Sequence, residues 1–388
     1  MAKKRKVLII TPGLNYLGGT ELETLITAKV FKENNVAEEI IIFSPVQASQ
    51  DIIEIYKEKG VNYWNYPKFF NNSIIKRLDG KVKQVFKLFK WDFSPLQFIF
   101  WRMIKVFYSF RFHYIVTDSV QFYYAPFLMN FKLEKNIIRF TSCYFYREWS
   151  HLQKSLLQKS KVINVTAHSQ KAYLLEKHGL KNLQVNDVFL WNENNLLNLK
   201  TRNIFKNTFG MLSRISREKR LEEGIFLIAK LKGLGVNANL FIQGPPKDID
   251  YLEYLQKLIS NLNLESEIII DTNPLQPSAI PTFFKKIKYF LITSIYEGGP
   301  NTGLESMAAG VPVLSYKIGA MPERLEPFKD QLIAEDLQEL LARALGLINL
   351  DEGEYINLSK KLRKRYLANY SNKSILSSTL KFILKIIK

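Results

Sequence analysis

The chain contains little that would suit an oxidising compartment or the interior of a membrane. Cys143 is the only cysteine among 388 residues, which excludes an intramolecular disulfide framework and fits a reducing cytosol. No uncharged stretch reaches the roughly 18 to 20 apolar residues that cross a bilayer. The basic start MAKKRKVLII lacks a signal-peptide core and a cleavage site, so we expect it to enter the first strand. These absences predict a cytoplasmic protein, either soluble or peripheral on the inner face of the cell membrane.

Acidic residues are scarce relative to basic ones. The 36 Asp and Glu residues against 55 Lys and Arg residues leave a net charge of +19. Such a charge suits an anionic membrane, a nucleic acid or an anionic substrate, and composition alone leaves all three open. The hydrophobic share of 47% supports real cores, and the length fits two domains of ordinary size.

The order of the apolar segments predicts two parallel sheets. Short, almost continuously apolar runs alternate with longer helical patterns, and the second half of the chain repeats the plan of the first. Strands have such continuous apolar runs when helices cover a parallel sheet on both faces. We therefore predict an α/β fold of two Rossmann-like, doubly wound domains that bind ligands at the carboxyl ends of their strands. The expected strands lie within 6–12, 38–45, 62–67, 114–119, 136–142, 162–169, 209–215, 238–245, 267–273, 289–294 and 311–316.

The most informative segment is 297–312, EGGPNTGLESMAAGVP, which has a glutamate on either side of a glycine turn. We expect a helix to begin near Asn301, with this asparagine as its N-cap. The positive end of that helix suits an anion such as a diphosphate, and the glycines let a ligand approach the backbone. Spacing alone would fit a solvated helix face. The strand–loop–helix–strand context instead favours a nucleotide-sugar site.

This segment resembles the Glu-x7-Glu signature of the large retaining family-4-type glycosyltransferases, the glycosyl transferases group 1. The similarity continues through KIGAMPE (317–323), which is similar to the family's G-G-x-P-E turn, with Ala320 where a second glycine is common. The resemblance implies the GT-B architecture, in which two Rossmann-like domains face a central cleft. It also implies that the last helix packs back on the N-terminal domain.

The resemblance and the Asn-rich composition of WNENNLLNLKTRN together suggest where the domains divide. The expected parts are an N-terminal acceptor-binding domain, a linker, a C-terminal nucleotide-sugar-binding domain and the returning helix, at 1–190, 191–203, 204–370 and 371–388 respectively.

The resemblance assigns roles around the donor. Glu297 is expected to contact the donor sugar near its reacting carbon, and Glu305 to accept hydrogen bonds from the two ribose hydroxyls. Arg214 and Lys219 resemble the family's Arg–Lys pair, which neutralises the diphosphate and then the leaving nucleotide without a metal. A solvated loop is the alternative for these two cations. Backbone N–H groups for the sugar and diphosphate are expected from three positions, Asn301, Thr302 and Leu304.

Glycine turns are expected to complete the donor site. Gly18 and Gly19, which follow the first expected strand, resemble the family's Gly-Gly-x-Glu loop that closes over the donor phosphates. QGPP (243–246) resembles the family's G-x-G-P turn and brings Gly244 close to the nucleotide. A lone Gly-Gly pair is otherwise only a turn signal.

The acceptor side departs from the family pattern. Many relatives carry a histidine at the end of a mid-domain strand, where this chain has Thr141, Ser142 and Cys143. Asp118, at the end of another expected strand, is a candidate acceptor contact, with a helix N-cap as the alternative. Because the family's departing phosphate is thought to take the acceptor proton, no protein base is assigned.

Residues 68–112 suggest a membrane-facing surface. Lysines surround an apolar helical stripe within this segment, which is typical of a basic amphipathic helix on an anionic membrane. A core-facing helix with solvated lysines is the alternative. The stripe is expected at Val82, Val85, Phe86 and Phe89, and the lysines at Lys81, Lys83, Lys87 and Lys90.

These observations together predict a retaining, metal-independent hexosyltransferase without a cofactor. It would move a hexose-type sugar from a nucleotide-diphosphate donor, such as a UDP-sugar, to a glycan or glycolipid acceptor in polysaccharide or lipopolysaccharide synthesis. No nucleic-acid partner is expected. The alternatives are a GT-B-fold nucleotide-sugar epimerase and a non-catalytic basic module that binds membrane or nucleic acid.

Overall fold

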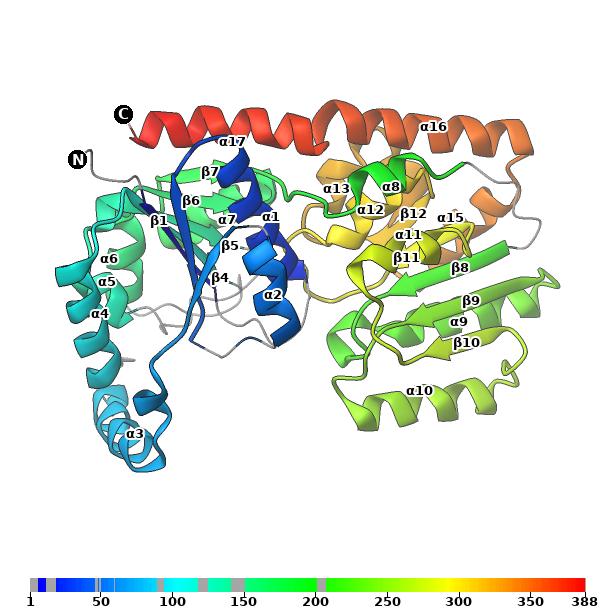
Figure 1. The fold of residues 1–388 in the computed structure, drawn as a ribbon. Helices are drawn as coiled ribbons and strands as arrows, with labels where there is room; N and C mark the ends of the chain where they lie inside the picture. Colours follow the sequence, from blue (N-terminus) through cyan, green and yellow to red (C-terminus); the bar gives the residue numbers. More distant parts are fainter. Residues whose placement is uncertain are drawn as a thin grey trace. The chain divides into compact units, whose positions relative to one another are not determined.

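The computed structural model describes residues 6–11, 19–45, 48, 50–58, 60–88, 94–117, 125–140, 151–200 and 207–387. Contacts divide the chain into two compact units. Unit 1 comprises Met1–Phe189 and Leu376–Lys388, and unit 2 comprises Leu190–Ile375. Each unit contains one sheet with helices on its faces (Figure 1).

Unit 1 is built on a seven-stranded parallel sheet in the order β3-β2-β1-β4-β5-β6-β7. Strands β1 and β2 are apolar and buried after their first residue, and all five residues of β5 are buried, because helices cover both faces of the sheet. The strands are β1 (Lys6–Ile10), β2 (Glu39–Phe43), β3 (Asn62–Trp64), β4 (Phe112–Thr117), β5 (Asn136–Phe140), β6 (Val162–Val165) and β7 (Leu183–Val185).

The helices of unit 1 connect these strands. They are α1 (Gly19–Glu33), α2 (Gln50–Glu58), α3 (Ser73–Leu88), α4 (Pro95–Phe107), α5 (Ala125–Asn130), α6 (His151–Lys159) and α7 (His168–His178), with short 3-10 helices at Lys68–Asn71 and Leu133–Lys135. Helix α4 is fixed to the core by Phe100 and Trp101, whose rings lie 5.7 and 4.7 Å from the ring of Phe43.

The C-terminal helix α17 (Asn372–Ile387) joins unit 1 from Leu376 onward. Two of its hydroxyl groups meet the side chain of Asn186, which follows β7. Ser378 Oγ donates to Asn186 Oδ1 at 3.2 Å, and Asn186 Nδ2 donates to Thr379 Oγ1 at 3.1 Å. This polar contact explains why the amphipathic end of the chain is ordered on the N-terminal unit.

Unit 2 repeats the plan with six parallel strands in the order β10-β9-β8-β11-β12-β13. The strands are β8 (Asn207–Leu212), β9 (Ala238–Gln243), β10 (Ile268–Asp271), β11 (Tyr289–Ile292), β12 (Val313–Tyr316) and β13 (Ile333–Ala334). Every strand expected from the sequence is present in the two sheets, and the predicted fold class of two Rossmann-like parallel-sheet domains is confirmed. The short strands β7 and β13 were not predicted.

The longer helices of unit 2 are α9 (Leu221–Gly233), α10 (Ile249–Asn261), α12 (Asn301–Ala309), α15 (Leu337–Ile348) and α16 (Glu352–Asn369). The shorter ones are α8 (Glu193–Leu197), α11 (Ile280–Phe284), α13 (Met321–Arg324) and α14 (Lys329–Leu332), with 3-10 helices at Arg217–Lys219, Pro277–Ala279 and Glu326–Phe328. Of the helices described, none has the length and apolar character to span a membrane.

Helix α8 lies within the segment that the sequence predicts as a linker. The Glu193 carboxylate accepts hydrogen bonds from the hydroxyl of Tyr366 and the backbone N–H of Asn372, at 2.8 and 2.6 Å, and Leu196 is fully buried. Part of the Asn-rich segment is therefore folded on unit 2.

Candidate functional site

The donor residues predicted in unit 2 follow the carboxyl ends of β8, β9 and β11. Backbone contacts hold the loops there together. The N–H of Ile295, after β11, donates to the carbonyl of Glu218 at 2.8 Å. The Thr293 hydroxyl lies 2.9 Å from the carbonyls of both Lys219 and Arg220. The loop after β8 is thus fastened beside the loop that carries Glu297.

Lys219 and Glu297 form an ion pair at this edge of the sheet. Lys219 Nζ donates to Glu297 Oε1, and the two side chains are 16% and 17% exposed. Ser294 Oγ donates to the same carboxylate oxygen at 3.0 Å. The partly exposed pair can therefore be reached by a ligand, while Ser294 limits the orientations of the carboxylate.

Arg214 lies near a second carboxylate, that of Glu218. Arg214 Nη2 and Lys247 Nζ are 3.8 and 3.7 Å from Glu218 Oε1. Burial by itself would raise the pKa of Glu218, but hydrogen bonds to the carboxylate and the charges of Lys247 and Arg214 outweigh it and lower that pKa. The site is therefore built from alternating cations and carboxylates. Arg217 faces away from this group, toward Asp248 at 3.1 Å.

Helix α12 begins at Asn301 as predicted, but the predicted asparagine cap is wrong. Pro300 occupies the N-cap position, and no side-chain hydrogen bond caps the helix. The chain enters the helix with the fixed φ of proline, so Asn301 is already in the first turn. Because no side chain caps this turn, its positive end suits an anionic group.

Arg324 contacts the backbone at the start of α12. It is fully buried, and its Nη1 donates to the carbonyl of Pro300 at 2.7 Å. At the other end of the helix, Arg363 donates to the carbonyls of Ala308 and Ala309 at 3.1 and 2.6 Å. A buried guanidinium beside a helix N-terminus adds to the positive potential there.

Glu305 is the most unusual carboxylate of the site. It lies on α12, its side chain is almost completely buried, and its Oε2 has no hydrogen-bond partner among the described residues. Burial raises the pKa of Glu305 from 4.5 to about 7. Buried acceptors are as a rule satisfied by a donor, so this oxygen is suited to accept a hydrogen bond from a ligand or an ordered water. Asn301 and Thr302, in the first turn of the same helix, are half-buried. Leu304 is fully buried, so only the backbone of Leu304 can face a ligand.

Two glycines allow backbone segments to approach one another closely around the site. Gly244 has a φ of +149°, and a Cβ there would lie 1.9 Å from the carbonyl oxygen of Ser213. Gly319 has a φ of +50°, and a Cβ there would lie 2.6 Å from the carbonyl oxygen of Gly298. The KIGAMPE turn therefore packs directly on the backbone next to Glu297.

The candidate residues of unit 1 are less completely placed. Gly19 is the first residue of α1. Gly18, Asp118 and the segment Thr141–Cys143 lie outside the described residues. His113 is buried, its Nδ1 lies 2.7 Å from Asn136 Oδ1, and burial lowers its pKa to about 4. This histidine is part of the core, so it does not replace the family's acceptor histidine.

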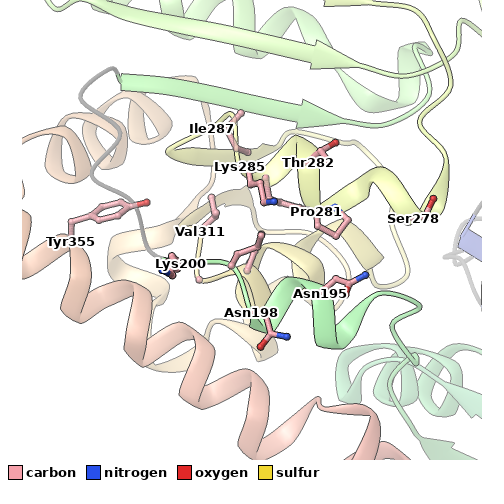
Figure 2. Close-up of a pocket in the computed structure, with 14 residues that line it drawn as sticks. Asn195, Asn198, Lys200, Ser278, Pro281, Thr282, Lys285, Ile287, Val311 and Tyr355 are labelled. Carbon is pink, nitrogen blue, oxygen red and sulfur yellow. The ribbon is translucent and has the colours of Figure 1, made fainter.

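A cavity of about 410 Å³ lies at the opposite edge of the unit 2 sheet. Ile287 and Val311, which precede β11 and β12, line it together with Lys200, Thr282 and Lys285 (Figure 2). Because it lies at the amino ends of the strands, this cavity is not part of the candidate site.

Sequence reasoning missed Ser294 and Arg324. Ser294 is the last residue of the expected strand 289–294, and Arg324 directly follows the KIGAMPE turn. A polar residue that ends an apolar strand beside a predicted site was an available signal. No pattern in the sequence shows that Arg324 turns inward.

Comparisons with known proteins agree with this arrangement. Residues 200–365 match the family model described as glycosyl transferases group 1. A glycosyltransferase of Methanocaldococcus jannaschii is 33% identical over 128 residues, which are 31% of this chain and 29% of that protein. Alpha-monoglucosyldiacylglycerol synthase of Streptococcus pneumoniae is 30% identical over 111 residues, which are 29% of this chain and 24% of the synthase. The matches thus span less than a third of these relatives.

Solved structures match over almost the whole chain. Anabaena HepE, in complex with UDP and glucose, has a TM-score of 0.73 at 14% identity and covers 98% of this chain and 100% of its own. Staphylococcus aureus TarM, in complex with fondaparinux, alpha-GlcNAc-glycerol and UDP, has a TM-score of 0.75 at 13% identity and covers 98% and 99%. These likenesses show the fold. The predicted resemblance is confirmed: the chain has the GT-B fold, and its residues 200–365 match the glycosyl transferases group 1 model.

Proposed function

We propose that this GT-B protein is a retaining hexosyltransferase that uses a UDP-sugar as donor and a glycan or glycolipid as acceptor. The observation that carries the proposal is the buried, orphaned carboxylate oxygen of Glu305 beside the uncapped start of α12. A carboxylate that lacks donors and a helix end that lacks a side-chain cap are complementary to a nucleoside diphosphate, which offers ribose hydroxyls and phosphate oxygens.

The cations around Glu297 fit the diphosphate part of such a donor. Lys219 contacts Glu297, and Arg214 lies near Glu218. A diphosphate in the site competes for both cations, and its departure is assisted when they neutralise the growing negative charge. These side chains supply that charge themselves, so we propose a reaction without a metal or a cofactor.

Glu297 is then placed for the sugar. When Lys219 turns to the diphosphate, the Glu297 carboxylate remains hydrogen-bonded by Ser294 and can accept hydrogen bonds from sugar hydroxyls. The bond between the sugar's anomeric carbon and the diphosphate oxygen breaks, and the acceptor hydroxyl bonds to that carbon on the same face. The acceptor proton passes to the departing phosphate oxygen, so that anomeric configuration is retained without a protein base.

The relatives support this choice of substrates. HepE and TarM each form a complex that contains UDP. The TarM complex also contains the glycan fondaparinux and alpha-GlcNAc-glycerol, and the name of the pneumococcal synthase includes a diacylglycerol. We therefore propose an acceptor on a polysaccharide or a lipid, with Asp118 of unit 1 as a candidate contact, and a cytoplasmic location. A membrane partner is proposed from other residues, those exposed on α3 and α4.

The test is an assay with a panel of radiolabelled nucleotide sugars, with and without glycan and glycolipid acceptors. We expect one UDP-sugar to bind and to release UDP faster when an acceptor is present. The anomeric proton of the product, observed by NMR, should show the configuration of the donor. Donor turnover to an epimeric sugar without acceptor would instead identify an epimerase, and the absence of any donor binding would contradict the proposal.

Variants connect the activity to the site. Glu297→Gln, Lys219→Ala and Arg214→Ala should each reduce transfer. Lys232→Ala is a matched control because Lys232 forms a similar pair with Glu267 in the same unit, at 2.7 Å, but before β10 rather than after a strand. Transfer that is unchanged in the first three variants would remove these residues from the mechanism.

A further inference from the structure

Helices α3 and α4 of unit 1 expose an unusually apolar surface. On α3, the exposed apolar residues recur every three or four positions, which places them on one helical face: Ile74, Leu78, Val82, Val85 and Leu88. On α4 the exposed set is Ile99, Met103, Val106 and Phe107. Leu88 is 81% exposed, and Val106 and Phe107 are each 76% exposed. Clustered exposure of this kind marks an interaction surface rather than ordinary surface variation.

The two helices are joined and held to the core, so this surface has a fixed support. Asp79 on α3 accepts hydrogen bonds from Ser94 Oγ at 2.7 Å and from the N–H of Leu96 at 3.2 Å, at the start of α4. Phe100 and Trp101, on another side of α4, are buried against Phe43. Figure 1 shows α3 projecting from the end of unit 1, with α4 between it and the sheet. The apolar residues are therefore carried by two helices that are hydrogen-bonded to each other and anchored on the core through α4.

The observed surface differs from the stripe that the sequence predicts. Val82 and Val85 belong to it, but Phe86 is half-buried, and Phe89 lies outside the described residues. The contribution of α4 was not predicted, because its apolar residues surround the whole helix and sequence alone does not show which of them are buried.

Charge selects the kind of partner. Within 68–88 and 94–107 eight residues are basic and one, Asp79, is acidic; the basic ones are Lys68, Lys76, Arg77, Lys81, Lys83, Lys87, Arg102 and Lys105. Arg77 and Lys81 are exposed within one turn of the apolar stripe on α3, as is Arg102 beside that on α4. A second copy of the chain would bring equal positive charges together. A nucleic acid would match the charge but not the aliphatic residues, which do not stack on bases.

We propose that the α3–α4 face docks on an anionic lipid surface. The aliphatic side chains enter the interface between headgroups and acyl chains, while the lysines and arginines contact the anionic headgroups. This docking goes beyond sugar transfer by unit 2 and needs no donor, so either proposal can fail without the other. It provides a means to hold the protein where lipid-linked acceptors lie.

The test is sedimentation of the full chain with vesicles of phosphatidylcholine alone or mixed with phosphatidylglycerol. We expect binding to the mixed vesicles that weakens with salt, and at least tenfold weaker binding to phosphatidylcholine alone. The double variant Ile74→Glu/Leu78→Glu should lose at least tenfold in binding to the mixed vesicles. Its control, Leu234→Glu/Ile249→Glu, adds the same charge at positions of similar exposure in unit 2, 59% and 57%, and should bind like the parent.

A second pair of variants separates local from overall charge. Arg77→Glu/Lys81→Glu should bind the mixed vesicles at least tenfold more weakly, whereas Lys257→Glu/Lys360→Glu, with the same net charge on exposed positions of unit 2, should change binding much less. Circular dichroism checks that each variant is folded, and UDP-sugar binding checks that unit 2 is intact.

Three outcomes would overturn the proposal. The first is equal vesicle binding by Ile74→Glu/Leu78→Glu and its control. The second is a concentration-dependent dimer in sedimentation velocity that the apolar variant abolishes, which would make the face a self-association surface. The third is binding to an RNA probe that is lost in the apolar variant while vesicle binding is retained.

Discussion

Unit 1 and unit 2 share a parallel-sheet plan, but they place their important ion pairs differently. In unit 1, Arg139 Nε on β5 donates to Glu23 Oε1 on α1 at 2.5 Å, and the two side chains are only 1% and 5% exposed. Arg139 Nη1 also donates to the carbonyl of Asn186 at 2.7 Å. In unit 2, the Lys219–Glu297 pair lies at the ends of strands and is 16% and 17% exposed.

The difference indicates which charges can serve a ligand. A pair inside the core cannot exchange its partner without exposing a charge to an apolar environment, so it acts as a fixed structural joint. A pair at the edge of a sheet can give up one partner to an anion, because water and ligand both reach it. Burial, rather than the mere presence of Lys, Arg and Glu, thus separates structural from functional charge in this chain.

The largest expected effect comes from breaking the buried pair. Arg139→Met leaves Glu23 buried without its cation and should lower the free energy of unfolding of unit 1 by about 3 to 5 kcal/mol. Urea denaturation followed by circular dichroism measures this change. The double variant Arg139→Met/Glu23→Leu, which removes both charges, should recover most of the loss. A single variant as stable as the parent would mean that the pair does not act as a joint.

Breaking the partly exposed Lys219–Glu297 pair should affect transfer more than folding. Lys219→Ala removes a cation from the leaving diphosphate and should lower kcat about 100- to 1,000-fold, as for the loss of one preorganised electrostatic contact. The free energy of unfolding should change much less than in Arg139→Met, since water reaches the pair and Ser294 still donates to Glu297. Steady-state kinetics and urea denaturation measure the two quantities. A stability loss as large as that of Arg139→Met would remove the contrast between the units.

Glu305 provides a test that depends on pH. Its pKa is raised from 4.5 to about 7 by burial, so the folded chain binds more protons than the unfolded chain between these values. The free energy of unfolding should therefore fall as pH rises through this window. Relative to Glu305→Gln, which cannot ionise, the parent should lose about 3 kcal/mol between pH 4 and pH 8. Urea denaturation of both proteins across this range measures the difference.

The same carboxylate should couple nucleotide binding to pH. Ribose hydroxyls donate to the ionised form, so UDP should bind the parent more tightly as pH rises from 6 to 8, and this trend should be much weaker in Glu305→Gln. Isothermal titration calorimetry measures both. If UDP affinity followed the same pH curve in the two proteins, Glu305 would not be a ligand contact.

The sequence predicted the strands correctly where the local hydrophobic pattern matches the burial of the strand in its sheet. Short apolar runs such as KVLII and YFLI, which alternate with longer helical patterns, favour buried strands in a two-sided sheet, which is why the sheet plan was predictable. The strands β7 and β13 have three and two residues and contain no such run. Their own sequence therefore does not predict them, and they form because they can pair with the last strand of each sheet.

The candidate site was predictable in residue type but less so in its contacts. Glu297, Lys219 and Glu305 were proposed from their resemblance to the family's motifs, yet that resemblance does not show that the first two contact each other or that Glu305 Oε2 lacks a partner. These facts depend on tertiary packing. The helix start illustrates the limit: an asparagine suggested a cap, but the preceding proline took that position. Arg324 was missed because its burial is decided by residues far away in the chain.

The smallest expected effect concerns the hydrogen bond that orients Glu297. Ser294→Ala removes the 3.0 Å contact to Glu297 Oε1, and a neutral donor to a charged group contributes about 1.5 kcal/mol at the lower end of its range, so kcat should fall about tenfold with little change in KM. Ser294→Thr retains a hydroxyl and should restore most of the rate. Ser315→Ala is the matched control, because Ser315 is buried and donates to the Tyr316 carbonyl at 2.7 Å, away from Glu297. If Ser294→Ala and Ser315→Ala lowered stability alike and did not change kcat, Ser294 would have only a structural role, like the Arg139–Glu23 pair of unit 1. Glu297 would then need no orienting hydrogen bond for transfer.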